Sequence, residues 1–180
     1  QGKTIGIVGC GRIGKKTAEK AVLGLGMKAV GYDPYLTAGA PGLEHIEMKD
    51  SLEEVFAEAD VVSLHLPETE ETKKLIGEKL FYLMTPTAIL INCARGGIVD
   101  EDALYEALKE KKIRAAGVDV LTEEPFDKDN KLFELDNFTA TPHNAALNTE
   151  TMNKMGLDAA KGIVEVMNGQ SPTWSVSSFK

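Results

Sequence analysis

Short apolar runs alternate with amphipathic runs along most of the chain. The apolar runs predict strands at residues 5–8, 27–33, 60–66, 87–92, 113–120 and 138–141. Runs with apolar residues at helical spacing predict helices at residues 14–25, 51–58, 100–112 and 148–168, and a helical part within 68–83. Alternating strands and helices predict an α/β fold with a parallel sheet, because parallel neighbours need crossover connections.

The sequence also predicts how one helix begins, which side of the last helix is buried and where the domain ends. Asp50 or Ser51 is expected to cap the helix that ends at Glu58. The long last helix carries a stripe that we interpret as core-facing, made of Met152, Met155, Ala159, Ile163 and Met167. We expect a cofactor domain over 1–170, and in 171–180, with Trp174, Val176 and Phe179, a return segment toward a substrate domain absent from this chain.

A glycine pattern follows the first strand. Gly9, Gly11 and Gly14 form G-x-G-x-x-G between a strand and a helix. Gly9 permits a tight turn, Gly11 lets the backbone approach a pyrophosphate, and Gly14 lets the helix pack closely on the strand. The free amides at the start of the helix then bind the phosphates. The pattern predicts a Rossmann-type doubly wound parallel sheet with helices on both faces, in three α/β/α layers.

The second strand ends in an acid. Asp33 lies 19 residues after Gly14, close to the spacing of about 20 expected for a carboxylate that binds the adenosine ribose 2′-OH. Pro34 and Tyr35 follow it, and no Arg is present there to bind a 2′-phosphate. We therefore expect NAD rather than NADP. The strand and helix context disfavours the alternative, a structural glycine turn and an unrelated surface Asp.

The composition narrows the possible partners. The chain has 180 residues, of which 43% are hydrophobic and 27% charged, as in globular domains. Its net charge of −8 disfavours a nucleic-acid partner, and no apolar run approaches a membrane span. Cys10 and Cys93 form no C-x-x-C pair, which predicts reduced thiols and a cytoplasmic protein. We expect no metal site, since the few His and Cys are scattered.

Polar groups follow the later strands, at the sheet edge where open parallel sheets bind ligands. They are His65-Leu-Pro67, Asn92-Cys-Ala-Arg-Gly-Gly97, Asp119-Val-Leu-Thr-Glu-Glu-Pro125 and Thr141-Pro-His143. One Arg, one Glu and one His therefore converge beside a predicted nicotinamide. A cation can bind a carboxylate or carbonyl oxygen, and a His can move a proton while a carboxylate orients it and favours its charged form.

Five motifs in this order resemble the NAD-binding domain of the D-isomer-specific 2-hydroxyacid dehydrogenases, which include phosphoglycerate and glycerate dehydrogenases. They are G-C-G-R-I-G, H-L-P-E-T-E-E-T, N-C-A-R-G-G, G-V-D-V-L-T-E-E-P and T-P-H-N-A, and they cover essentially the whole chain. The resemblance implies that Arg95 binds substrate, Glu124 partners the His and His143 is the acid/base. Glu123 competes with Glu124, and only the position before Pro125 favours Glu124.

The resemblance also implies a cofactor cleft and further partners. Arg12 and Ile13 would meet the pyrophosphate, and Asp33 the adenosine ribose. The other residues lining the cleft would be Pro67, Thr72, Cys93, Ala94, Arg95, Asp119 and His143. Family members commonly form homodimers through this domain and have a second, substrate-binding domain. Asn144 departs from the aliphatic residue expected after the His, which could alter the nearby pocket.

Four other residues are interpreted as structural. His65 ends a strand and is structural or cofactor-adjacent, and His45 is a loop or edge residue. Tyr105 and Lys109 imitate the Tyr-x-x-x-Lys of short-chain dehydrogenases. We reject that interpretation because i, i+4 pairs arise often by chance on a helix and no Ser precedes Tyr105 at a suitable distance.

Two functions remain open. The first is an enzyme that transfers a hydride between NAD(H) and a small D-2-hydroxy acid or 2-keto acid, such as phosphoglycerate or glycerate, with little activity in the cofactor domain alone. The alternative is an NAD(H)-sensing, non-catalytic scaffold of the same fold, as in the related transcriptional corepressors. The intact Arg, Glu and His favour the enzyme, and turnover by the full-length protein would discriminate.

Overall fold

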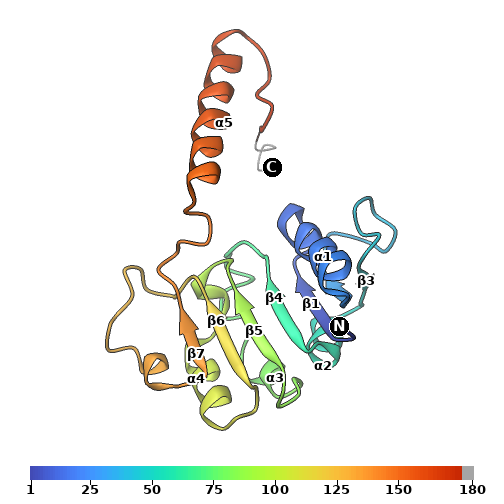
Figure 1. The fold of residues 1–180 in the computed structure, drawn as a ribbon, viewed down its shortest axis with the longest axis vertical. Helices are drawn as coiled ribbons and strands as arrows, with labels where there is room; N and C mark the ends of the chain where they lie inside the picture. Colours follow the sequence, from blue (N-terminus) through green and yellow to red (C-terminus); the bar gives the residue numbers. More distant parts are fainter. Residues whose placement is uncertain (176–180) are drawn as a thin grey trace. The chain divides into compact units, whose positions relative to one another are not determined.

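The computed structural model describes residues 1–175 and contains a seven-stranded, fully parallel sheet. The strand order is β3-β2-β1-β4-β5-β6-β7, with each neighbouring pair in parallel register (Figure 1). The strands are β1 Thr4–Val8, β2 Lys28–Tyr32, β3 Glu47–Met48, β4 Val61–Leu64, β5 Ile89–Asn92, β6 Ala115–Val118 and β7 Phe138–Ala140. The order reverses between β1 and β4, as in doubly wound dinucleotide-binding sheets.

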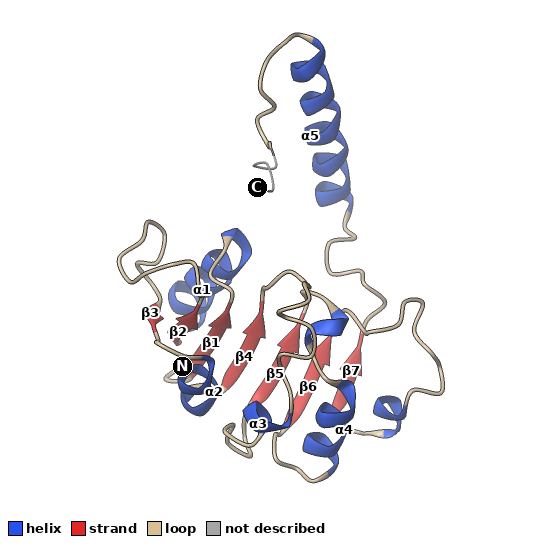
Figure 2. Ribbon diagram, turned by 180° about the vertical axis from the view of Figure 1, so that it is seen from behind, coloured by secondary structure: helices blue, strands red, loops and turns tan. Residues whose placement is uncertain are grey.

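Helices cover both faces of the sheet, which confirms the predicted fold class. Helix α1 packs on one face beside β1 and β2, whereas α2, α3 and α4 lie on the other face (Figure 2). Their bounds are α1 Arg12–Leu25, α2 Leu52–Glu58, α3 Glu78–Phe81 and α4 Glu101–Lys109, with short 3-10 helices η1 Gly96–Ile98 and η2 Lys131–Glu134.

The two faces bury separate apolar clusters. The larger cluster joins β4, β5 and β6 to α2, α3 and α4 and includes fully buried Phe56 and Phe81. The smaller cluster lies under α1 and includes Ile7, Ala18 and Ala21. Strands β1, β2 and β4 have buried residues on both faces, which explains their nearly continuous apolar runs, whereas β5 and β6 alternate buried with partly buried residues.

Local signals at the helix ends explain where two helices begin. The Ser51 hydroxyl accepts a hydrogen bond from the Glu54 amide, so Ser51 rather than Asp50 is the N-cap of α2. The Asp100 carboxylate caps α4 in the same way. Helix α4 ends earlier than predicted, and Lys111 has a positive φ of 57° just beyond it.

The helical part predicted within 68–83 is the short helix α3. Only Glu78–Phe81 form a helix, and the preceding residues pair with the segment after β5 instead. The Lys74 amide donates to the Gly97 carbonyl at 2.7 Å, and Ile76 forms a parallel bridge with Val99. Ile76 is therefore buried at a strand-like pairing, whereas Leu80 and Phe81 are buried on α3.

The chain forms two compact units, residues 1–143 and residues 144–180. The second unit contains α5, Thr149–Met167, which has Asn148 as its N-cap. After the helix, the Glu165 carboxylate accepts hydrogen bonds from the amide and hydroxyl of Thr173, which lowers the pKa of Glu165. Trp174 is more than half exposed. Val176 and Phe179 of the predicted return segment lie outside the described residues.

The stripe on α5 that we expected to face a core is not buried. None of the helix residues is buried, and Met152, Met155, Ile163 and Met167 are all exposed. The described part of this unit has no other helix to cover the stripe, but Pro172 and Trp174 of the following segment line a pocket along it. No helix among residues 1–175 is both long and apolar enough to cross a membrane.

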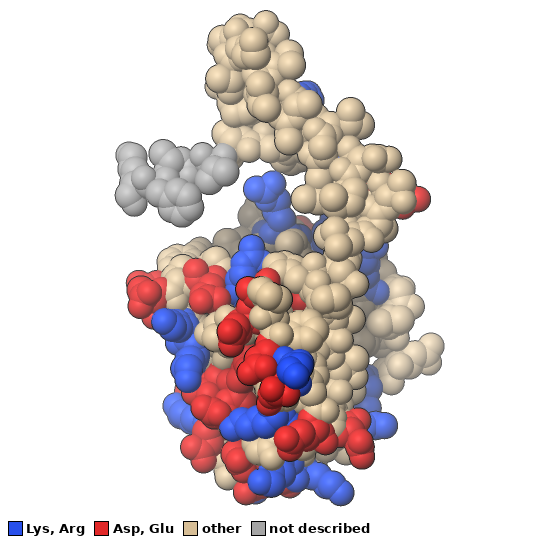
Figure 3. Space-filling view, turned by 90° about the vertical axis from the view of Figure 1, so that its left-hand side faces the viewer, with Lys and Arg blue, Asp and Glu red and all other residues tan. Residues whose placement is uncertain are grey.

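Charged side chains of both signs are interspersed on the surface. Figure 3 shows Lys and Arg mixed with Asp and Glu on one face of the molecule. Several of these charges form exposed pairs, such as Lys131 with Asp102 at 2.7 Å and Lys79 with Glu53 at 2.6 Å. Exposed pairs of this kind contribute little to stability, so they determine surface character more than fold.

Candidate active site

The glycine turn after β1 has the geometry that the sequence predicts. Gly9 has a φ of +89°, which favours glycine, and its backbone lies against the carbonyl of His65. A Cβ on Gly14 would lie 2.1 Å from the Gly9 carbonyl oxygen, so only glycine lets α1 begin this close to β1. A Cβ on Gly11 would meet nothing within 4 Å. The open side of the turn at Gly11 therefore leaves room for a phosphate.

The start of α1 offers donors toward that space. The Ile13 amide donates to no atom within residues 1–175, and the Ile13 side chain is exposed. No acidic side chain occupies the first turn of α1. A helix N-terminus with an amide that has no acceptor, and with no acidic side chain nearby, is suited to binding an anion.

Asp33 at the end of β2 is bonded to this turn. One carboxylate oxygen accepts the Cys10 amide at 2.9 Å, and the other accepts the Tyr35 amide at 2.9 Å. Each oxygen retains a further lone pair, so the half-buried carboxylate can still accept ribose hydroxyls. Besides its predicted role in binding the adenosine ribose, Asp33 therefore also holds the Cys10 amide within the glycine turn.

A cleft of about 690 Å³ lies at the point where the strand order reverses. Residues from the segments after β1, β4 and β5 line it, including Thr17, His65, Pro67 and Arg95. Ligands of doubly wound sheets bind at this place because neighbouring crossovers separate there toward opposite faces.

Arg95 is held by the backbone of its turn. The buried Asn92 side chain accepts the Ala94 amide at 3.0 Å and donates to the Arg95 carbonyl at 2.9 Å. The guanidinium donates to the Ala94 carbonyl and forms no ion pair with any residue in the described part of the chain. It is an exposed cation at a cleft, a setting suited to binding a carboxylate bidentately.

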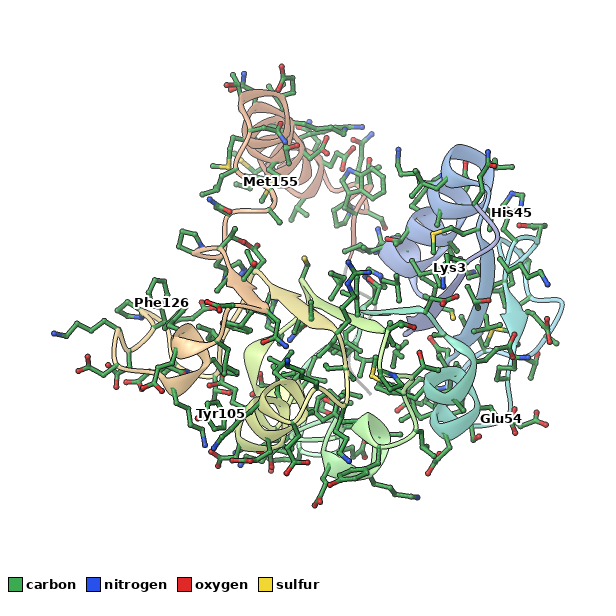
Figure 4. All side chains as sticks on the ribbon, turned by 60° about the horizontal axis from the view of Figure 1, so that its bottom comes forward. Lys3, His45, Glu54, Tyr105, Phe126 and Met155 are labelled. Carbon is green, nitrogen blue, oxygen red and sulfur yellow. The ribbon has the colours of Figure 1, made fainter. Side chains whose placement is uncertain are left out.

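His143 and Glu124 form a direct pair. Nδ1 of His143 lies 2.9 Å from Oε2 of Glu124, so the structure selects Glu124 over Glu123 as the partner. The His143 amide donates to the Asp119 carbonyl, and the Thr141 hydroxyl donates to the buried Asp119 carboxylate. These bonds fix the turn in which His143 has a φ of +51°. A pocket of about 380 Å³ beside the pair is lined partly by Phe126, which Figure 4 labels.

The predicted site residues lie along one edge of the sheet but do not all touch. Arg95 follows β5 and His143 follows β7, with β6 and Asp119 between them. Arg95 lines the larger cleft, whereas His143 and Glu124 line the smaller pocket. The hydroxyl of Thr72 donates to the Pro67 carbonyl at 2.7 Å and accepts the Thr69 amide, so it supports its own loop.

The remaining candidates have structural contacts. His65 is partly buried, burial lowers its pKa, and its Nε2 lies 3.0 Å from the Ser63 hydroxyl. Tyr105 lies on α4 (Figure 4), with the ammonium of Lys109 5.2 Å from its ring centroid. His45 lies in a turn. Among residues 1–175, no cluster of three or more His, Cys, Asp or Glu could hold a metal.

Both cysteines are free thiols. Burial, with a smaller contribution from Asp33, raises the pKa of Cys10 to about 12. Cys93 is exposed at the end of β5, and desolvation followed by the charge of Asp119 raises its pKa. Neither thiol is therefore activated as a nucleophile.

Three supporting residues were not predicted. Asn92 holds the turn of Arg95, Thr141 holds Asp119, and Glu68 accepts the Gly97 amide at 3.2 Å. All three residues belong to motifs quoted above, so their position beside the predicted residues could have indicated them. The sequence does not show, however, that Glu68 binds a backbone amide 29 residues away.

The chain is similar to known proteins over nearly its whole length. The family model of the D-isomer specific 2-hydroxyacid dehydrogenase NAD binding domain matches residues 1–145. D-3-phosphoglycerate dehydrogenase of Methanocaldococcus jannaschii is 45% identical over 169 residues, which are 94% of this chain and 32% of that protein. Glyoxylate reductase of Korarchaeum cryptofilum is 41% identical over 174 residues, covering 95% and 51% respectively.

The fold is also similar to solved structures over nearly the whole of this chain. The holo form of D-mandelate dehydrogenase from Rhodotorula graminis superposes with a TM-score of 0.88 at 36% identity. The alignment covers 99% of this chain and 53% of that one. The chain thus spans between about a third and about half of the proteins that it matches.

Proposed function

The chain belongs to the D-isomer specific 2-hydroxyacid dehydrogenases, whose NAD binding domain it contains, and from this premise we propose that it serves reversible reduction of a 2-keto acid. The product would be a small 2-hydroxy acid, either a D acid such as phosphoglycerate or glycerate or the achiral glycolate, in line with the named activities of its relatives. The observation that carries the proposal is the contact of 2.9 Å between His143 and Glu124 at the carboxyl edge of the sheet.

NAD is the cofactor of this domain, and the residues present fit it. Gly11 leaves the turn open, the Ile13 amide is available, and Asp33 retains lone pairs for ribose hydroxyls. We propose that these groups bind the pyrophosphate and the adenosine ribose, with Arg12 beside them. Asp33 would favour NAD over NADP, because its charge repels a 2′-phosphate. NADH, when bound, supplies the hydride that reduces the carbonyl carbon.

We propose that Arg95 binds the substrate carboxylate and polarises the keto oxygen. Its guanidinium has no ion-pair partner within the described residues, so binding an anion breaks no existing pair. Asn92 fixes the backbone on which it stands. An Arg in this position gives orientation as well as charge, because its two parallel N–H groups match a carboxylate.

His143 would be the proton donor in reduction. If Nδ1–H donates to Glu124, Nε2 is left to hold the proton that goes to the keto oxygen. Glu124 would orient the ring and stabilise the imidazolium. Both side chains are roughly half exposed, at 51% and 44%. We infer that a second domain covers them during turnover, since excluding water strengthens such interactions.

The proposal also includes the cellular compartment and the oligomeric state of the protein. We propose a cytoplasmic protein, in keeping with its free thiols and acidic composition. We also propose a homodimer through this domain, as the family resemblance implies. A clean monomer in sedimentation at high protein concentration would count against the dimer.

Steady-state turnover by the full-length protein tests the enzymatic proposal. NADH oxidation should be seen with glyoxylate, hydroxypyruvate or its phosphate, and His143→Ala should lose most of kcat while retaining cofactor binding. A full-length protein that binds NADH but reduces no 2-keto acid would instead support the sensing scaffold. Activity preserved in His143→Ala would contradict the assigned proton donor.

A further inference from the structure

We infer that Glu68 is a positioning residue for Arg95, acting through the backbone of Gly97. The inference rests on the proposed role of Arg95 in binding the substrate carboxylate. Glu68 belongs to the loop after β4, whereas Arg95 and Gly97 belong to the turn after β5. Both loops line the larger cleft.

The contact between the two loops is close. The Gly97 amide donates to Oε2 of Glu68 at 3.2 Å. A Cβ on Gly97 would lie 2.4 Å from Oε1 of the same carboxylate, so the acid lies directly against the glycine backbone. Only glycine at this position permits that approach.

The hydrogen bond completes the start of η1. This short helix begins at Gly96, immediately after Arg95, and Arg95 provides no side-chain cap. The first amides of a helix lack partners within it, so an acceptor must come from elsewhere. Glu68 supplies a charged acceptor, which makes a stronger bond than a neutral one.

Arg95 is thereby held from two sides. Asn92 binds its carbonyl from within the turn, and Glu68 fixes the residue two positions further on. The Glu68 loop is itself fixed, since the Thr72 hydroxyl binds the Pro67 carbonyl and the Lys74 amide binds the Gly97 carbonyl. No ion pair with a described residue orients the guanidinium, so its direction depends on this backbone.

Glu68 is suited to a substitution test. It is exposed, so its replacement leaves the core intact. Glu71 is an exposed acid in the same segment, and its carboxylate forms no hydrogen bond or ion pair with any other residue among 1–175. Glu71→Gln therefore controls for the loss of one negative charge beside the cleft.

Kinetics of the full-length protein test the positioning role. Glu68→Ala should raise KM for the 2-keto acid about fivefold, the factor that one net hydrogen bond supplies, with kcat and the Kd for NADH within about twofold of wild type. Glu68→Gln should restore KM, because its amide oxygen can still accept from Gly97. Glu71→Gln should behave as wild type. An unchanged KM in Glu68→Ala, or a loss confined to NADH affinity, would overturn the inference.

Amide NMR of the 180-residue chain tests the contact itself. The Gly97 amide should exchange with solvent deuterium faster in Glu68→Ala than in the wild type, because it loses its acceptor, and Glu71→Gln should leave its exchange unchanged. Equal exchange of the Gly97 amide in Glu68→Ala and in the wild type would refute the contact. If the wild-type full-length protein reduced no 2-keto acid, the proposed function would fail while this exchange measurement still reported on Glu68 and Gly97.

Discussion

Alanine at three glycines should separate what each glycine does for folding from what it does for binding. At Gly14 a Cβ would lie 2.1 Å from the Gly9 carbonyl oxygen and 3.0 Å from Ile7, so Gly14→Ala must displace α1. Overpacking of this kind costs about 1–3 kcal/mol. Gly24 lies in the exposed part of α1, and a Cβ at this position would meet nothing within 4 Å. Gly24→Ala should therefore stabilise the chain by about 0.5–1 kcal/mol.

Gly11→Ala is the informative member of the series. Its Cβ would meet nothing within 4 Å, so the free energy of unfolding should fall by less than about 1 kcal/mol, as for alanine at an N-cap. The same methyl group would occupy the space proposed for the pyrophosphate, and NADH should bind at least about tenfold more weakly, which is about 1.4 kcal/mol. Urea unfolding followed by circular dichroism measures the first quantity, and NADH fluorescence titration the second.

The comparison within the series decides the outcome. Gly24→Ala should bind NADH as wild type does, while Gly11→Ala should remain folded and bind poorly. Wild-type NADH affinity in Gly11→Ala would refute the assignment of the turn to the pyrophosphate. A large loss of stability in Gly11→Ala would show instead that the space beside the turn is needed for folding.

Two further predictions concern single side chains. Asp33→Ala should weaken NAD(H) more than NADP(H), narrowing the preference in a calorimetric titration, and should weaken both somewhat because the Cys10 amide loses its acceptor; equal affinities of the wild type for the two cofactors would refute this. With a thiol reagent at about pH 8, only exposed Cys93 should react in the native chain, since burial raises the pKa of Cys10 to about 12. Rapid modification of both thiols would contradict the burial of Cys10.

The sequence predicts this fold well where local chemistry and burial agree. The glycine turn needs Gly9 and Gly14 for steric reasons that act within a few residues, so a sequence pattern is sufficient to locate it. Strands β1, β2 and β4 are buried on both faces and therefore read as apolar runs. The pairing of Glu124 with His143 is also anticipated, and the structure resolves the ambiguity with Glu123.

Contacts between distant backbone segments were not predictable in the same way. Residues 74–76 pair with residues 97–99 through backbone amides and carbonyls, which are the same for every residue type and therefore give no sequence signal. The hydrogen bond from the Gly97 amide to Glu68 could not be predicted for the same reason, because it joins a backbone amide to a side chain 29 residues away. The apolar stripe of α5 was predictable from its helical spacing, but the spacing does not indicate which other segment would cover the stripe.

Titration of the 180-residue chain with NADH tests the central claim most directly. The account predicts saturable binding of one NADH per chain, with amide shifts concentrated at Gly9–Gly14, Asp33 and Cys93–Arg95, and weaker binding of NADPH. Little or no reduction of a 2-keto acid should accompany binding, because both His143 and Glu124 remain open to solvent. A folded chain that binds no NADH, or that shifts amides elsewhere on the sheet, would contradict the account.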